Sequence, residues 1–183
     1  MNWDRQRSER RIDGGRARGF SLIELLIVVA IILVLAAIAI PNYLRAKISA
    51  NESSAVASLR TVTTAETTYA SSWGSGYAVA IDNLGGPPPC LAATAATACI
   101  VDSLVTVAPY SKSGYTFSAA GNTLVGTVYN GFEANATPNS VDVTGKRAFC
   151  SDQTGVLRAN TTGVAIGTAP GACATVITLI VGN

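Results

Sequence analysis

The apolar positions of this chain fall into two regions that have different periods. From residue 20 to residue 40, only Ser21 and Glu24 interrupt a continuous apolar series. A helix of that length spans about 30 Å, which matches the hydrocarbon core of a bilayer. The pattern therefore predicts a membrane-spanning helix over residues 20–40.

Helical patterning continues beyond the apolar run. Apolar side chains recur at steps of 4, 7, 4, 3, 7 and 4 residues, at Leu44, Ile48, Ala55, Leu59, Val62, Tyr69 and Trp73. This stripe has the helical period and predicts a face that packs against the rest of the chain. We expect one helix over residues 20–73, with Pro41 as the point where it kinks or loosens.

From residue 74 onwards the pattern is typical of strands and loops. The run "GYTFSAAGNTLVGTVYN" predicts a β-hairpin whose turn contains Gly121 and Asn122. A second pair of short strands flanks residues 152–155, and "TVITLIV" is a candidate buried strand. The proline-rich segment 74–103 is expected to be a surface loop. The fold class is thus α+β: a long N-terminal helix packed on an antiparallel sheet in a globular domain over residues 74–183.

Charge separates the N-terminal segment from the remainder. The whole chain carries +2, and residues 1–19 hold six arginines against three acids, so this segment is +3 and the remainder is −1. The arginines keep the N-terminus in the cytoplasm by the positive-inside rule, since only Arg45 and Lys47 lie close to the other end of the run. A near-neutral remainder without a basic cluster gives no nucleic-acid site.

The residue types that carry most catalysis are missing or scattered. Histidine is absent, which removes the commonest general base, and Glu133, Asp142 and Asp152 have no close partner in sequence. We therefore expect a protein that is not an enzyme and needs no cofactor.

The cysteines point to disulfides in an oxidising compartment. All four lie beyond the apolar run at intervals of 9, 51 and 23 residues, and no histidine accompanies them, so a zinc or other metal site is not expected. Four thiols allow three pairings. Short loops close with the least loss of entropy, which favours the local pairing, Cys90 with Cys99 and Cys150 with Cys173.

The glutamate within the apolar run needs a partner. A charge at the centre of a spanning helix costs about 2.5 to 3.5 kcal/mol on insertion scales, and less near the end, where Glu24 lies. The simplest alternative is a lone acid that reaches back to the cytoplasmic headgroups.

The segment "GFSLIELLIVVAIILVLAAIAIPNY" resembles the N-terminus of type IV prepilins and the related pseudopilins. The similarity extends over residues 18 to about 73 and rests on Gly19 before Phe20, an acid at the fifth position after that bond, and proline at the twenty-second. In that family a membrane aspartyl peptidase cuts after the glycine and methylates the new N-terminal residue. The resemblance implies a cleaved leader over residues 1–19 and an N-methylated Phe20.

The same resemblance implies how the mature chain assembles. The cut creates an α-amine that methylation leaves protonatable, and Glu24 can pair with the amine of Phe20 in its own chain or in a neighbouring subunit. The segment around Pro41 is where such helices lose hydrogen bonds on assembly.

The function implied is that of a structural subunit of a type IV pilus. The bacterial inner membrane holds the precursor, the pilus assembly machinery polymerises it, and the product is an extracellular helical homo-oligomer for adhesion, twitching motility or DNA uptake. A pseudopilin of a type II secretion system is the nearest alternative, but major pseudopilins generally bind calcium through C-terminal carboxylates, and here the last acid is Asp152.

A different class of protein is a secreted binding protein with an ordinary signal peptide. The sequence "AIA" at residues 37–39 satisfies the small-x-small rule, and cleavage there would make Ile40 the mature N-terminus. A final surface feature is Asn135 in "EANAT", which resembles a bacterial N-glycosylation site. An exposed loop without sugar is the preferred interpretation of that asparagine.

Overall fold

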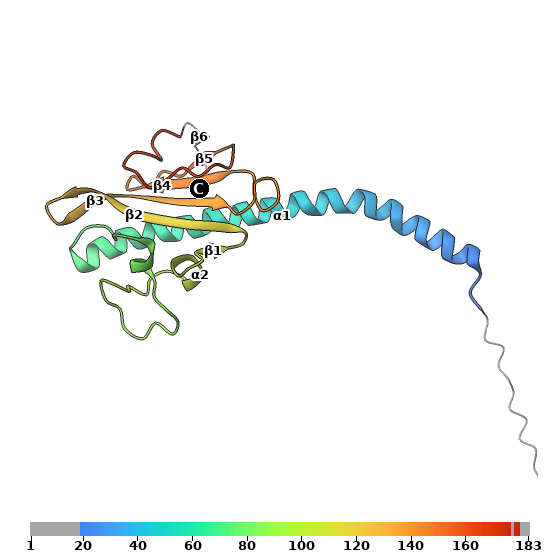
Figure 1. The fold of residues 1–183 in the computed structure, drawn as a ribbon, viewed down its shortest axis with the longest axis horizontal. Helices are drawn as coiled ribbons and strands as arrows, with labels where there is room; N and C mark the ends of the chain where they lie inside the picture. Colours follow the sequence, from blue (N-terminus) through green and yellow to red (C-terminus); the bar gives the residue numbers. More distant parts are fainter. Residues whose placement is uncertain (1–18, 177, 180–183) are drawn as a thin grey trace, which may run out of the picture. The chain divides into compact units, whose positions relative to one another are not determined.

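The computed structural model describes residues 19–176 and 178–179, and it begins with one long helix. Helix α1 runs Leu22–Trp73 and contains Pro41 (Figure 1). The helix expected over residues 20–73 is therefore confirmed to within two residues at its start. Of the predicted leader, residues 1–18 lie outside the described residues, and so do 177 and 180–181 of the predicted last strand.

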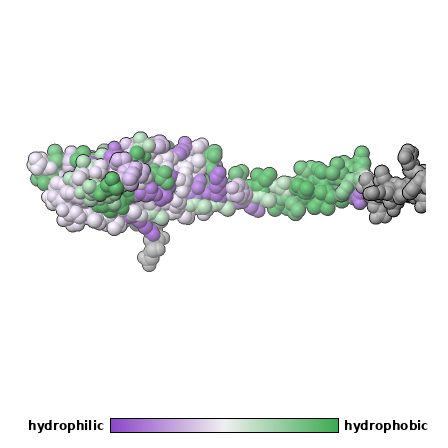
Figure 2. All heavy atoms as spheres, turned by 90° about the horizontal axis from the view of Figure 1, so that it is seen from below, coloured by the Kyte–Doolittle hydropathy of each residue, from purple (hydrophilic) through white to green (hydrophobic). Residues whose placement is uncertain are grey.

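The chain divides into two compact units, residues 1–40 and 41–183. Within the first unit, none of the described side chains is buried, and the exposed fraction reaches 83% at Phe20. Figure 2 shows this part of α1 as continuous apolar surface. Among the described residues, α1 contains the one stretch that is long and apolar enough to cross a membrane.

The second unit, residues 41–183, is called the head. It contains the rest of α1 and a sheet of six antiparallel strands whose order in space is their order in the chain. The strands are β1 (Ser111–Lys112), β2 (Tyr115–Val125), β3 (Val128–Pro138), β4 (Ala148–Asp152), β5 (Arg158–Asn160) and β6 (Thr178–Leu179). A sheet with this order is a β-meander, in which consecutive strands lie side by side. The long helix together with this antiparallel sheet confirms the α+β class expected from the sequence.

The hairpin formed by β2 and β3 turns later than the sequence pattern suggests. Val125 pairs with Val128, so the loop consists of Gly126 and Thr127, and Gly126 has a φ of +66°. The prediction of a turn at Gly121 and Asn122 is wrong. A Cβ on Gly121 would lie 2.6 Å from the Ala78 carbonyl oxygen, so this glycine allows a neighbouring segment to approach the strand.

The segment between α1 and the sheet is more structured than a surface loop. It contains a 3₁₀ helix, η1 (Ile81–Leu84), and it leads into a one-turn helix, α2 (Ser103–Thr106). The side chains of Ile81, Leu84 and Ala98 are buried. The expectation of a purely superficial loop over residues 74–103 is therefore wrong, because five of its apolar residues belong to the core: Ala78, Ile81, Leu84, Ala98 and Val101.

The core of the head lies between α1 and the sheet. One face of α1 contributes Ala55, Leu59, Val62, Ala65 and Tyr69, and the strands contribute Tyr115, Phe117, Phe132, Ala134, Ala136 and Phe149. Tyr69 and Trp73 have ring centroids 4.9 Å apart, and Tyr115 and Phe149 are 5.9 Å apart in a stacked arrangement. The alanines of β3 and the aromatic rings of β2, β3 and β4 together fill the core that the sheet shares with α1.

One carboxyl group is enclosed in this core. Glu66 is fully buried on α1; its Oε2 accepts a hydrogen bond from the Ala78 backbone N–H at 2.8 Å, and no described residue pairs with its Oε1. Burial raises the pKa of Glu66 to about 7, although the hydrogen bond from Ala78 acts in the opposite direction. The folded head therefore holds a proton on Glu66 at mildly acidic pH.

Glu66 should make the stability of the head depend on pH. Its pKa is higher in the folded state than in the unfolded chain, so the stabilisation is complete below about pH 4.5 and is lost as pH rises through about 7. The free energy of unfolding should fall by up to about 3 kcal/mol across that interval. Urea denaturation of the full-length chain in detergent, followed by circular dichroism from pH 4 to 8, measures this slope.

Glu66→Gln should flatten that slope, because the amide keeps an acceptor for Ala78 and cannot ionise. Asp82→Asn, which alters an exposed acid of the head, serves as the control and should leave the slope unchanged. An unaltered slope in Glu66→Gln would show that the proton is held elsewhere.

Candidate functional site

The N-terminal end of α1 is closed by the glutamate of the apolar run. Ser21 occupies the N-cap position, and its backbone N–H donates to Glu24 Oε2 at 3.1 Å. Glu24 is the third helical residue, so this contact is the backbone half of a capping box. The acid therefore satisfies one of the donors that every helix leaves unpaired at its start.

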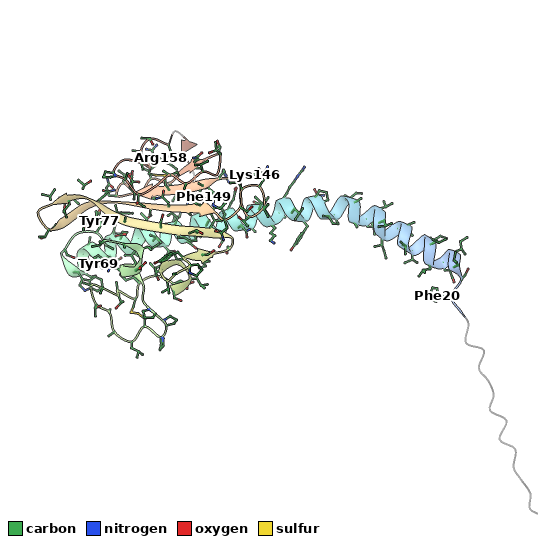
Figure 3. All side chains as sticks on the ribbon, in the orientation of Figure 1. Phe20, Tyr69, Tyr77, Lys146, Phe149 and Arg158 are labelled. Carbon is green, nitrogen blue, oxygen red and sulfur yellow. A yellow bond between two sulfur atoms is a disulfide. The ribbon has the colours of Figure 1, made fainter. Side chains whose placement is uncertain are left out.

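The residues before the cap are open to solvent. A Cβ on Gly19 would have no atom within 4 Å, and Phe20 precedes the helix with most of its surface exposed (Figure 3). The Gly19–Phe20 bond is thus outside the helix and accessible, as a protease requires. The structure does not test cleavage, methylation or the pairing of Glu24 with an amine, and these stay predictions.

Pro41 lies inside α1 and is exposed. Proline has no N–H, so the carbonyl of residue 37 loses its usual helical donor. The helix continues through this position in the structure. Its proposed loosening during assembly remains a prediction.

Within the head, a charged clamp joins α1 to the start of β4. The carboxylate of Glu52 accepts from Arg147 Nε at 3.0 Å and from an Arg147 terminal nitrogen at 2.7 Å, and it also accepts from the backbone N–H groups of Lys146 and Arg147. Burial raises the pKa of Glu52, but the Arg147 side chain and the two backbone donors outweigh burial and hold the pKa below its usual value. The clamp fixes two segments that are 95 residues apart in sequence.

The C-terminal part of the head is held by a disulfide and a buried acid. Cys150 is bonded to Cys173 and Cys90 to Cys99, which is the local pairing that the sequence favours. Glu133 on β3 is buried, and its Oε2 accepts from the Cys173 backbone N–H at 3.2 Å. Burial raises the pKa of Glu133, and the nearby charge of Asp152 raises it further, against the opposing effect of the Cys173 N–H.

Folding brings together two acids that are distant in sequence. Glu133 on β3 lies directly opposite Asp152 on β4, and both are buried. Asp152 accepts from the backbone N–H and the hydroxyl of Thr154, so the two carboxylates bind the chain segments that cover them. Among the described residues, no group of three or more acids, cysteines or histidines could hold a metal ion.

Asn135 occupies a different environment from the one expected. It lies within β3, only 2% exposed, and its Nδ2 donates to the Gly167 carbonyl oxygen at 2.5 Å. The interpretation as an exposed loop is wrong, because Gly167 and its neighbours cover this face of the strand. The folded head does not present the amide of Asn135 to a glycosyltransferase.

Sequence reasoning did not identify Glu52 and Glu66 as residues with a role. Both fill gaps in the apolar stripe: the two steps of seven residues, from Ile48 to Ala55 and from Val62 to Tyr69, each skip a position on the buried face of α1. A charged residue at such a position must find a partner inside the fold, and this signal was available in the sequence.

Comparison with known proteins gives three matches, each of which covers less than a third of the chain. A family model described as the prokaryotic N-terminal methylation motif matches residues 15–40. The type IV major pilin protein PilA of Myxococcus xanthus is 50% identical over 54 residues, which is 30% of this chain and 24% of that protein. The type IV wide pilus major component PilA4 of Thermus thermophilus is 64% identical over 36 residues, which is 20% of this chain and 28% of that protein.

These similarities cover about a quarter of the length of either relative. No solved structure matches the chain.

Breaking the clamp should destabilise the head without changing its core. Arg147→Ala removes the charge and two of the hydrogen bonds on Glu52, and it should lower the free energy of unfolding by about 1 to 3 kcal/mol. Lys146→Ala is the matched control, since Glu52 uses only the backbone N–H of Lys146, and it should change the value by less than about 0.5 kcal/mol. Urea denaturation at pH 7 measures both, and equal effects would mean that the side chain of Arg147 contributes nothing.

Proposed function

We propose that this chain, which its N-terminal segment identifies as a type IV pilin, is a structural subunit of a type IV pilus. The observation that carries the proposal is the exposed apolar segment of α1, which begins at Leu22, is capped by Glu24 and follows an accessible glycine–phenylalanine bond. A surface of this kind has to be covered by lipid or by other helices. In a chain that moves from the membrane into a filament, lipid covers this surface first and neighbouring helices cover it afterwards.

In the proposed pathway the precursor first spans the inner membrane through residues 20–40. Prepilin peptidase removes residues 1–19, and Phe20 becomes N-methylated at the new terminus. The assembly machinery then transfers the mature chain into a homo-oligomeric filament that reaches the cell surface. Both relatives are named as major pilus components, which supports a filament as the final state.

The physics of the transfer explains why a charge is kept in the apolar segment. Lipid tails are as apolar as leucine, so moving α1 from the bilayer into a bundle of like helices gains little from the hydrophobic effect. Packing and polar contacts between helices must therefore supply the free energy that favours the filament over the bilayer. Glu24 supplies one, because a protonated amine on Phe20 of a neighbouring subunit would neutralise a carboxylate that has only a backbone partner in the single chain.

The alternative of an ordinary signal peptide places a cut after Ala39. This position lies well inside α1, and helical hydrogen bonding continues on both sides of it. A protease would have to unwind the helix there. The start of the mature chain distinguishes the two proposals directly.

The first test of the function is the mature N-terminus. Mass spectrometry of filaments sheared from the cell surface should detect this chain beginning at N-methylated Phe20 and lacking residues 1–19. Gly19→Val, which places a branched side chain before the bond, should leave the precursor uncut in the membrane fraction. A mature chain that starts at Ile40 would contradict the pilus proposal.

The second test separates the two uses of Glu24. Glu24→Ala removes the charge and the cap, whereas Glu24→Gln keeps an acceptor for the Ser21 N–H and removes the charge alone. If the charge pairs with a neighbouring amine, both variants should insert normally and yield few or no filaments, since leaving a buried charge without its partner costs about 3 to 5 kcal/mol per subunit. Filament yield is measured after shearing, with precursor levels matched.

Wild-type filament yield from Glu24→Gln together with failure of Glu24→Ala would assign the acid to capping alone. Normal yield from both variants would show that the acid is incidental to assembly.

A further inference from the structure

The head contains a basic pocket beside the part of α1 that follows the apolar segment. The pocket has a volume of about 370 Å³, and its walls are residues 45–52 of α1, the loop before β4, and Thr161. Arg45, Ser49 and Glu52 lie on one helical face at spacings of four and three residues. Lys146, labelled in Figure 3, lines the pocket from the loop before β4.

The charges around the pocket do not cancel. Its lining carries three cations, Arg45, Lys146 and Arg147, and a single acid, Glu52. Four hydrogen bonds from Arg147 and the adjacent backbone already use the carboxylate of Glu52. The positive charges of Arg45 and Lys146 therefore remain at the pocket without a carboxylate of the lining to balance them.

Those two cations are weakly engaged by the described residues. No described carboxylate lies within 4 Å of Arg45, and Lys146 Nζ is 3.9 Å from Asp142 Oδ1 in a pair whose side chains are both more than 60% exposed. Such a pair contributes little in water. The hydroxyl groups of Ser49 and Thr161 add donors without charge.

The position of the pocket in the chain limits which anion can reach it. Arg45 follows the last residue of the apolar run, Ile40, by five residues, which is about 7.5 Å of helix. The headgroup layer of a bilayer extends about 5 to 7 Å beyond the hydrocarbon on each side. When residues 20–40 span a membrane, Arg45 therefore lies at the outer edge of the headgroup layer, within reach of the lipid phosphates through its long side chain.

We propose that this pocket binds the headgroup phosphate of an anionic phospholipid in the outer leaflet of the inner membrane, before the subunit enters a filament. The inference rests on the proposed function for the membrane-spanning precursor, and it adds a specific lipid contact to it. Arg45 and Lys146 hold the phosphate, Ser49 and Thr161 donate hydrogen bonds, and Ile48 gives the glycerol region an apolar wall.

A lipid fits the pocket better than the acidic surface of a second copy. The exposed acids of the head are Asp82, Asp102 and Asp142, and each already has a partner within its own chain, which for Asp142 is Lys146. Asp82 accepts from the Tyr110 hydroxyl at 3.2 Å, whereas Asp102 pairs with Lys112 at 3.2 Å and caps α2. A bilayer presents its phosphates within reach of Arg45 without breaking the contacts of Asp82 and Asp102.

The test uses the full-length chain in proteoliposomes that contain a trace of photoactivatable lipid. One probe is phosphatidylglycerol and the other is phosphatidylcholine with the same acyl chains, and cross-linked segments are mapped by mass spectrometry. Mapping separates labelling of the pocket from labelling of the arginine-rich segment before residue 20. The phosphatidylglycerol probe should label residues 48–52 and 159–163 at least tenfold more than the phosphatidylcholine probe.

Matched variants separate a pocket from a general surface charge. A direct hydrogen bond between a cation and the phosphate contributes about tenfold or more in binding, so the Arg45→Gln and Lys146→Gln changes together should lower pocket labelling about a hundredfold. Lys47→Gln removes the same charge two residues from Arg45, outside the pocket lining, and should lower the labelling at most about fivefold, which is the general effect of a cation near an anionic surface. Circular dichroism verifies that every variant folds.

Several outcomes would overturn the lipid site. Equal losses in Lys47→Gln and Lys146→Gln would mean a diffuse surface effect, and equal labelling by the two probes would mean no headgroup preference. Loss of labelling in 10 mM inorganic phosphate, but not in chloride of equal ionic strength, would identify free phosphate as the ligand. Unchanged labelling in the double variant together with loss of filaments would assign the pocket to a second copy. The labelling needs no filament, so it can succeed where the pilus proposal fails.

Discussion

A carboxylate that leaves water needs a partner, and α1 meets this requirement in three different ways. Glu24, in the apolar segment, accepts from the backbone of its own cap. Glu52 accepts from a guanidinium and two backbone donors across the head. Glu66, fully enclosed, has one backbone donor and binds a proton at a pH where most acids do not. Among the described residues, Glu52 is the one of these three acids that pairs with a charged side chain.

These three solutions divide the helix by environment. The clamp at Glu52 and the enclosed Glu66 hold α1 to the rest of the head, so the second part of this helix is a rigid element of the head. The apolar first part makes no such contacts, and its surface is available to lipid or to other helices. One uninterrupted helix thereby presents one part to its own chain and the other to its surroundings.

How much the sequence could predict varied with the range of the interaction. The helix, the strand pair around residues 152–155 and the nearest-neighbour disulfides depend on local periodicity or short loops, and the structure has them. The turn was misplaced because Gly121 serves a contact with Ala78, which no local pattern reveals. Asn135 was misjudged for the same reason, since the segment that covers it lies 32 residues away. Glu52 and Glu66 were detectable in principle, as the polar positions in an otherwise apolar helical stripe.

The order of the strands has a mechanical consequence. In a sheet where neighbours in space are neighbours in the chain, a pull on the C-terminus would detach strands one at a time from the edge, which needs far less force than shearing them together. The disulfide between Cys150 on β4 and Cys173 limits this stepwise detachment of strands. Strand β6 follows Cys173 in the chain and can detach, but β5 lies within the covalent loop that the disulfide closes on β4, a central strand. Tension that enters through the C-terminal end is thus delivered to the middle of the sheet, where every strand has two neighbours.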